Sequence, residues 1–253
     1  MLLHSQIIGE GRPLVILHGF LGSGDNWKTL ANKFAEDGFQ VHLVDQRNHG
    51  KSFHSDDWGY GVMVDDLKNY CDHHSLASIA LLGHSMGGKT AMAFGVSYPE
   101  MVDKLVIADI GPKSYPSHHQ DILKALGSLD FDTLTSRKEA DAVLSVYIKD
   151  LGTRQFLLKN LYWESKGKLG LKINLQVLTD KISEVGKALD VNAVYTGETL
   201  FLKGEKSGYI ESMDEIGIKK QFPNSKIAVV TKSGHWLHAE NPSEFYQIVI
   251  IFL

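Results

Sequence analysis

Six short apolar segments recur along the chain, with room for a helix between most of them, and this alternation constrains the fold more than any other feature. They cover residues 13–17, 41–45, 79–83, 105–109, 199–202 and 227–230. Between them, apolar residues repeat three and four positions apart over 27–35 and 63–71, which indicates helices with one buried face. Strands joined by crossover helices pair in parallel. The sequence therefore predicts an α/β fold with a mostly parallel central sheet and helices on both faces.

The alternation breaks between residues 112 and 191. Helical patterns over 138–148 and 153–162 follow one another there without a buried strand between them. The segments 1–111 and 192–253 contain all of the predicted strands. We therefore predict one core built from these two segments, with a helical cap inserted over 112–191.

A G-x-S-x-G motif stands directly after the predicted strand 79–83 and directly before a helical pattern over 89–96. It runs from Gly83 through Ser85 to Gly87. In this setting the motif forms a nucleophile elbow, a sharp turn that presents the serine hydroxyl above the carboxyl edge of the sheet. The motif alone is common by chance, so its position between strand and helix is what makes Ser85 the candidate nucleophile.

The same residues also fit the Walker A pattern G-x-x-x-x-G-K-T, from Gly83 to Thr90. In a nucleotide-binding P-loop the backbone amides would hold phosphates, Lys89 would reach the β and γ oxygens, and Thr90 would bind Mg²⁺. Such a protein needs neither a histidine after its last strand nor an early His-Gly turn. A serine hydrolase uses both, and because both are present we prefer the hydrolase.

The late histidine is His235, which follows the last predicted strand. A serine hydroxyl is a weak nucleophile until a base removes its proton, and His235 is the predicted base. His238 is the alternative, but it stands closer to a predicted helix over 242–252.

The early His-Gly turn is His18-Gly19 at the end of the first long strand. We predict that the backbone amides of Phe20, after this turn, and of Met86, after the nucleophile, form the oxyanion hole. For the side chain of His18 we predict a structural role in bracing the turn.

The acid that orients the base is predicted at Asp109, at the end of the strand that follows the elbow helix. This gives the chain order Ser, Asp, His of the α/β-hydrolases. In the commoner arrangement the acid follows the strand before the histidine strand, but here Ser207 occupies that slot. A turn or capping role for Asp109, with Glu205 or Asp214 as the acid, is the alternative.

The composition of the chain argues against several classes of binding partner and bound metal. The chain has 26 basic and 30 acidic residues, a net charge of −4, which argues against a general nucleic-acid binder or a polybasic membrane-surface protein. Cys71 is the single cysteine, so neither an internal disulfide nor a cysteine-based zinc site is expected.

No metal, cofactor or membrane partner is expected either. The sequence has no H-E-x-x-H and no dinucleotide G-x-G-x-x-G after its first strand. His54, Asp56 and Asp57 are interpreted as a solvated loop rather than a cation site. We find no signal peptide and no apolar run approaching the ~18 residues of a membrane span, and we predict a cytoplasmic protein.

Two motifs together resemble one subfamily of α/β-hydrolase esterases. These are D-x-R-N-H-G-x-S, from Asp45 to Ser52, and G-H-S-M-G-G-K, from Gly83 to Lys89. The resemblance extends over nearly the whole chain and includes the cap stretch 154–160. It implies an α/β-hydrolase fold, activity on short-chain acyl esters and thioesters, and an acid after the strand that follows the elbow. The chain departs from the subfamily at Gln46 and at Glu205-Lys206, which puts the substrate preference in doubt.

Without the resemblance, the polar residues of the first motif are interpreted as a hydrogen-bonded loop that shapes the wall of the site. Phe20 and Trp236, next to the predicted oxyanion donor and base, are candidates for the wall that contacts substrate. The predicted reaction is hydrolysis of a small acyl ester or thioester through an acyl-enzyme, without a cofactor. A carbon–carbon bond hydrolase or perhydrolase of the same fold stays open, as does a hydrolase-like ligand receptor.

Overall fold

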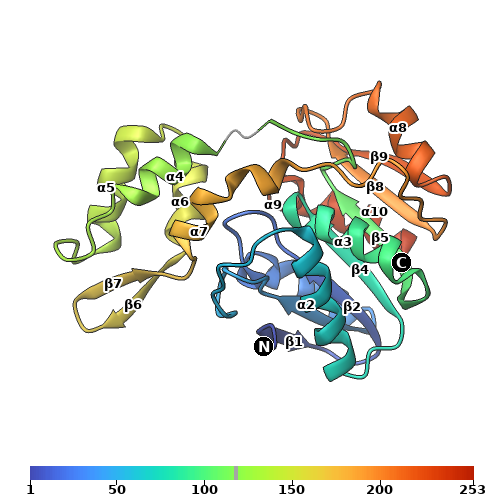
Figure 1. Cartoon of the computed structure of the whole chain (residues 1–253), viewed down its shortest axis with the longest axis horizontal. Coiled ribbons are helices and arrows are strands. Elements are labelled where there is room, and N and C mark those ends of the chain that lie inside the picture. Colours follow the sequence, from blue (N-terminus) through green and yellow to red (C-terminus); the bar gives the residue numbers. More distant parts are fainter. Residues whose placement is uncertain (117–118) are drawn as a thin grey trace.

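The computed structural model describes residues 1–116 and 119–253, and its core is a seven-stranded sheet in the order β1-β3-β2-β4-β5-β8-β9 (Figure 1). The strands are β1 Ser5–Ile8, β2 Arg12–Leu17, β3 Phe39–Val44, β4 Ile79–His84, β5 Val102–Ala108, β8 Thr199–Gly204 and β9 Ser225–Val230. The edge strand β1 pairs antiparallel with β3, and the other pairings within this sheet are parallel. The predicted α/β class with a mostly parallel sheet is therefore confirmed.

Helices cover both faces of the sheet. Leu14 and Ile16 of β2 belong to the apolar cluster of one face, whereas Val15 and Leu17 belong to that of the other. The first cluster includes side chains of α1 Lys28–Glu36 and α10 Pro242–Phe252; the second includes side chains of α2 Tyr60–His73, α3 Met86–Ser97 and α8 Asp214–Gln221. Because both faces are buried, the central strands read as continuous apolar runs in the sequence.

A largely helical segment separates β5 from β8. It contains α4 Gln120–Gly127, α5 Arg137–Tyr147, α6 Leu151–Leu158, β6 Leu161–Ser165, β7 Lys168–Leu171, α7 Leu175–Asp180 and a 3-10 turn at Ile182–Gly186. Figure 1 shows most of these elements gathered to one side of the sheet, at the left of the view. Their apolar cluster also contains Phe20 and Met86. The segment proposed as a cap thus packs against the residues that flank Ser85.

Strand β1 and the end of helix α6 differ from the sequence-based prediction. Strand β1 was not predicted, because it is short and its side chains are only half-buried. The predicted helix over 153–162 ends at Leu158 instead, where Arg137 donates hydrogen bonds to the carbonyls of Leu158 and Leu161, at 2.7 Å each. The chain then continues as the β6–β7 hairpin, whose side chains are mostly exposed and so lack the apolar signature of a strand.

Within the described ranges 1–116 and 119–253, no helix is long and apolar enough to cross a membrane.

Candidate active site

Ser85 lies in the sharp turn between β4 and α3. Its backbone has φ = 51°, in the left-handed region that a non-glycine residue rarely adopts, and its amide donates to the carbonyl of Ala108 at 3.0 Å. A Cβ placed on Gly87 would lie 2.3 Å from the carbonyl oxygen of Leu17, so only glycine permits this close packing of turn and strand. This is the geometry of the elbow predicted from the sequence.

Ser85, His235 and Asp109 lie in one hydrogen-bonded row, although they come from three distant parts of the chain. The hydroxyl of Ser85 is 3.0 Å from Nε2 of His235, and Nδ1 of His235 is 2.8 Å from Oδ2 of Asp109. With a neutral imidazole, this arrangement corresponds to a hydroxyl donating to Nε2 and an Nδ1–H donating to the carboxylate. The Asp109 side chain is fully buried and that of His235 is 22% exposed. The histidine therefore faces both the buried carboxylate and the open side of the site.

Asp109 has two further donors. The amide of Gly204 donates to Oδ1 at 3.0 Å, and the hydroxyl of Ser207 donates to Oδ2. Ser207, which occupies the commoner acid position, thus donates a hydrogen bond to the carboxylate of the predicted acid. This bond has no signal in the sequence, because only the pairing of β5 with β8 brings Ser207 to Asp109.

The alternative acids are engaged elsewhere. Glu205 accepts a hydrogen bond from the amide of Lys232 at 2.7 Å, and Asp214 accepts from Nζ of Lys113 at 2.6 Å. The alternative base, His238, stacks on Trp27 with ring centroids 4.1 Å apart and planes 9° apart. Burial lowers the pKa of His238 to about 3, so this ring is neutral near pH 7.

His84, the residue between Gly83 and Ser85 in the elbow motif, has no role in the sequence-based prediction. Its Nε2 lies 2.8 Å from the backbone carbonyl of His235, to which it donates. Burial holds the pKa of His84 well below its ordinary value, which keeps the ring neutral. The residue before the nucleophile therefore fixes the backbone of the predicted base.

The predicted oxyanion donors are the backbone amides of Met86, which follows Ser85 directly, and of Phe20, which lines the same cavity as Ser85. Neither amide has a hydrogen-bond partner among residues 1–116 and 119–253. A Cβ on Gly19 would lie 3.3 Å from Cβ of Ser85 and 2.7 Å from Nδ1 of His84, so the loop that carries Phe20 approaches the elbow directly. Two unpaired donors beside the hydroxyl suit a carbonyl oxygen that becomes an anion.

His18 braces this loop from within. Its Nδ1 lies 2.8 Å from the carbonyl of Gly19, and its Nε2 accepts from the amide of Gln46 at 3.0 Å. Burial lowers the pKa of His18, in keeping with a neutral ring that donates on one side and accepts on the other. These bonds are those of a structural residue.

Hydrogen bonds tie the polar loop from Asp45 to Ser52 to neighbouring segments of the chain. Asp45 accepts from the amide of Gly24 at 2.8 Å, and Arg47 donates to Asp66 at 2.9 Å. His49 accepts from the amide of Leu21 at 3.2 Å, behind the loop that carries Phe20. The motif therefore holds the loop that carries Phe20 in place from the side away from the cavity.

Lys89 and Thr90, the residues that fit the Walker A pattern, are buried and hydrogen-bonded to other parts of the chain. Lys89 is fully buried and donates from Nζ to the carbonyl of Lys113, and Thr90 donates to Oε1 of Gln46 at 2.9 Å. Neither side chain is placed to bind a phosphate in front of the turn. No group of three or more His, Cys, Asp or Glu side chains in the described part of the chain is arranged to hold a metal ion.

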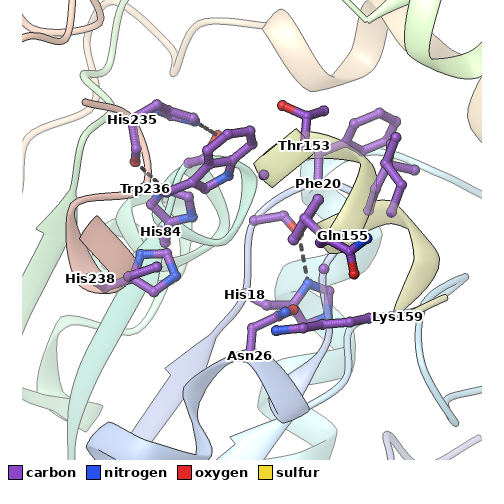
Figure 2. A pocket seen from close by; sticks show the side chains of 18 of the residues that line it. His18, Phe20, Asn26, His84, Thr153, Gln155, Lys159, His235, Trp236 and His238 are labelled. Carbon is purple, nitrogen blue, oxygen red and sulfur yellow. Dashed lines mark hydrogen bonds between the residues drawn. The ribbon is translucent and has the colours of Figure 1, made fainter. Parts of the chain in front are cut away.

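Ser85 is on the lining of a cavity of roughly 510 Å³. Figure 2 shows His18, Phe20, His235 and Trp236 among the side chains around this cavity. The loop with His18 and Phe20, the segment with His235 and Trp236, and residues of α6 including Phe156 all contribute to its lining. Phe20 and Trp236, the predicted wall residues, both lie on it. The α6 residues bring the inserted segment over the site, so the cavity lies between the sheet edge and the proposed cap.

The sequence pattern of the alpha/beta hydrolase fold family matches residues 12–242. The chain belongs to the α/β-hydrolase fold family. It is 36% identical over 252 residues to the zebrafish (Danio rerio) sn-1-specific diacylglycerol lipase ABHD11, covering 97% of this chain and 79% of that relative. It is 31% identical over 245 residues to the esterase YbfF of Escherichia coli, covering 95% of this chain and 92% of the relative.

A solved structure of a marine microorganism esterase superposes on this α/β-hydrolase with a TM-score of 0.97 and 42% sequence identity, covering 100% of both chains. These similarities confirm the predicted α/β-hydrolase fold and an esterase-like member of that superfamily. The chain is thus an ester-cleaving hydrolase of the carboxylesterase type.

Proposed function

We propose that this α/β-hydrolase cleaves short-chain carboxylic esters and thioesters through an acyl-enzyme on Ser85. The observation that carries the proposal is the row from Ser85 through His235 to Asp109, with contacts of 3.0 Å and 2.8 Å. Nucleophile and base are within hydrogen-bond reach, and the base is oriented by a third group, which is the arrangement that activates a serine.

In the first half-reaction, Ser85 attacks the acyl carbonyl while Nε2 of His235 takes its proton. Asp109 holds the Nδ1–H and stabilises the imidazolium. The oxygen of the carbonyl becomes an anion, which the amides of Phe20 and Met86 bind. His235 then gives the proton to the departing alcohol or thiol, and the acyl group stays on Ser85.

In the second half-reaction, water replaces the leaving group. His235 takes a proton from the water, which attacks the acyl-enzyme and forms a second tetrahedral anion at the same two amides. Collapse of this anion releases the carboxylic acid and returns the proton to Ser85. No metal or organic cofactor takes part in these steps.

The preference for short acyl chains rests on the position of α6 over the cavity. Phe20, Trp236 and Phe156 are on the lining, and Phe156 and Trp236 contact each other with ring centroids 5.7 Å apart. A bounded apolar wall rewards each added methylene by ~0.8 kcal/mol until the wall is reached, after which overpacking opposes longer chains. One relative is named as an sn-1-specific diacylglycerol lipase and another as an esterase, so the acyl-chain preference is the property to measure.

The test of the proposed nucleophile is Ser85→Ala. We expect the variant to fold normally and to lose hydrolysis of p-nitrophenyl butyrate by about three or more powers of ten. A fluorophosphonate probe should label the wild-type protein at Ser85 and leave the variant unlabelled. Ester turnover that survives in a folded variant refutes the nucleophile, and a single turnover in the wild type would instead indicate a ligand receptor.

A cytoplasmic location stays a prediction.

A further inference from the structure

The imidazole of His235 is covered on one face by an aromatic ring that the reaction scheme does not use. The ring of Tyr209 stacks on it with centroids 3.9 Å apart and planes 15° apart. The ring of His84 lies 4.8 Å away at a tilt of 42°, while Asp109 and Ser85 hold the two ring nitrogens. Tyr209 is the near-parallel neighbour in van der Waals contact with the imidazole.

The backbone of Tyr209 is held on both sides. Its amide donates to the hydroxyl of Ser207 at 3.2 Å, and its carbonyl accepts from the hydroxyl of Tyr115 at 2.7 Å. Tyr115 also accepts from the amide of Gly111 at 2.8 Å. The two tyrosine rings stack with centroids 5.4 Å apart at 29°. Tyr115, Tyr209 and His235 therefore form a continuous aromatic column.

Lys89, the residue that suggested a P-loop, anchors the far end of this column. Its ammonium lies 5.1 Å from the centroid of the Tyr115 ring and donates to the carbonyl of Lys113. Burial, together with the charge of Lys113, lowers the pKa of Lys89 to about 7. Lys113 lies 5.2 Å from the same ring and pairs with Asp214 at 2.6 Å. These contacts fix the segment that follows Asp109 and carries Tyr115.

We propose that Tyr209, held in place by Tyr115 and its anchor Lys89, is a positioning residue for the base. Its ring keeps the imidazole of His235 in the plane that serves both Ser85 and Asp109, and its π face stabilises the imidazolium that forms when Ser85 gives up its proton. The inference rests on the proposed role of His235 and adds a group that acts through it. A cation over an aromatic face is stabilised most where water is excluded, and that charge exists only in the transition state and the intermediates.

The test separates the ring of Tyr209 from its hydroxyl and from its place on the cavity wall. Tyr209→Phe keeps the ring and should retain kcat within about twofold, whereas Tyr209→Leu should lower kcat by about 5- to 30-fold with KM for p-nitrophenyl butyrate nearly unchanged. Tyr115→Phe keeps its own ring but removes the bond to the Tyr209 carbonyl, and should lower kcat by about 3- to 10-fold. Titration of active sites with fluorophosphonate corrects each rate for the folded fraction.

The matched control is Phe156→Leu, another aromatic ring on the same cavity, which contacts Trp236 rather than His235. It should act on KM. If Tyr209→Leu changes only KM, as Phe156→Leu is expected to do, then Tyr209 is only a residue of the cavity wall. If Tyr209→Phe has a kcat as low as that of Tyr209→Leu, then the aromatic ring of Tyr209 is not the group that acts on His235. Either result overturns the proposal. If Tyr209→Leu does not fold, the kcat of Tyr115→Phe decides. Failure of the proposed nucleophile appears separately, as activity retained by Ser85→Ala.

Discussion

Replacing Asp109 with Asn tests the proposed acid, because the surroundings of Asp109 leave an amide side chain no satisfactory orientation. One carboxylate oxygen of Asp109 accepts from the amide of Gly204, and the other accepts from both Ser207 and His235. Every neighbour of the carboxylate is thus a donor. An Asn side chain has one acceptor end and one donor end, so either orientation points an N–H₂ group at a donor in a fully buried place.

The two orientations have different costs. If the amide oxygen faces Gly204, the N–H₂ group faces His235, which must move its proton to Nε2 to accept the bond. Nε2 then cannot take the proton of Ser85. If the amide oxygen faces His235, the correct tautomer survives, but the Gly204 amide is left unpaired at about 1–3 kcal/mol. The first orientation removes the base outright, so we expect kcat to fall by about 10³- to 10⁴-fold, the size of effect known for this change in serine proteases.

The assay is steady-state hydrolysis of p-nitrophenyl butyrate by Asp109→Asn, Glu205→Gln and Asp214→Asn, with thermal unfolding of each. KM should change little for Asp109→Asn, because the carboxylate does not line the cavity. Glu205 and Asp214 bond to other parts of the chain, so their variants should keep kcat within about threefold. An Asp109→Asn protein that folds and keeps more than about a tenth of its kcat, or a larger loss in Glu205→Gln, would refute the placement of the acid.

Three further predictions concern substrate size, nucleotides and pH. On p-nitrophenyl esters, kcat/KM should rise from acetate to about butyrate or hexanoate and fall steeply for long chains; a maximum at dodecanoate, or activation at a lipid interface, contradicts the capped cavity. Calorimetry with Mg²⁺ and ATP should show no binding to the wild type or to Lys89→Met, because the ammonium of Lys89 is committed to the Lys113 carbonyl; binding that Lys89→Met abolishes would restore the P-loop. Burial lowers the pKa of His238 from 6.5 to about 3, so the unfolded chain binds the extra proton between these pH values and the free energy of unfolding should fall as pH falls below 6.5. His238→Phe should reduce that slope by about 1.4 kcal/mol per pH unit, as measured by urea unfolding, and an unchanged slope would show that His238 does not contribute.

The sequence by itself determined the parts of this protein that follow from local pattern. Buried parallel strands are continuous apolar runs and one-sided helices repeat with their own period, so the core strands and helices such as 242–252 were predictable. The elbow is equally local, since the turn needs glycine two residues before and two residues after Ser85, at Gly83 and Gly87. Because the carboxyl ends of parallel strands meet at one edge of the sheet, the sequence predicts that Asp109 and His235 lie near Ser85, and they do.

Tertiary structure decided whatever depends on contacts between loops that are far apart in the chain. Helix α6 ends where the side chain of Arg137 reaches the carbonyls of Leu158 and Leu161, and no periodicity within 153–162 records that contact. The bond from Ser207 to Asp109 exists because β5 and β8 are neighbours. The stack of Tyr209 on His235 joins two loops after different strands, and it has no counterpart in residue spacing. Local propensity acts over a few residues. The direction of a loop side chain instead depends on how helices and strands pack together, and the sequence pattern gives the order of these elements along the chain but not their positions in space.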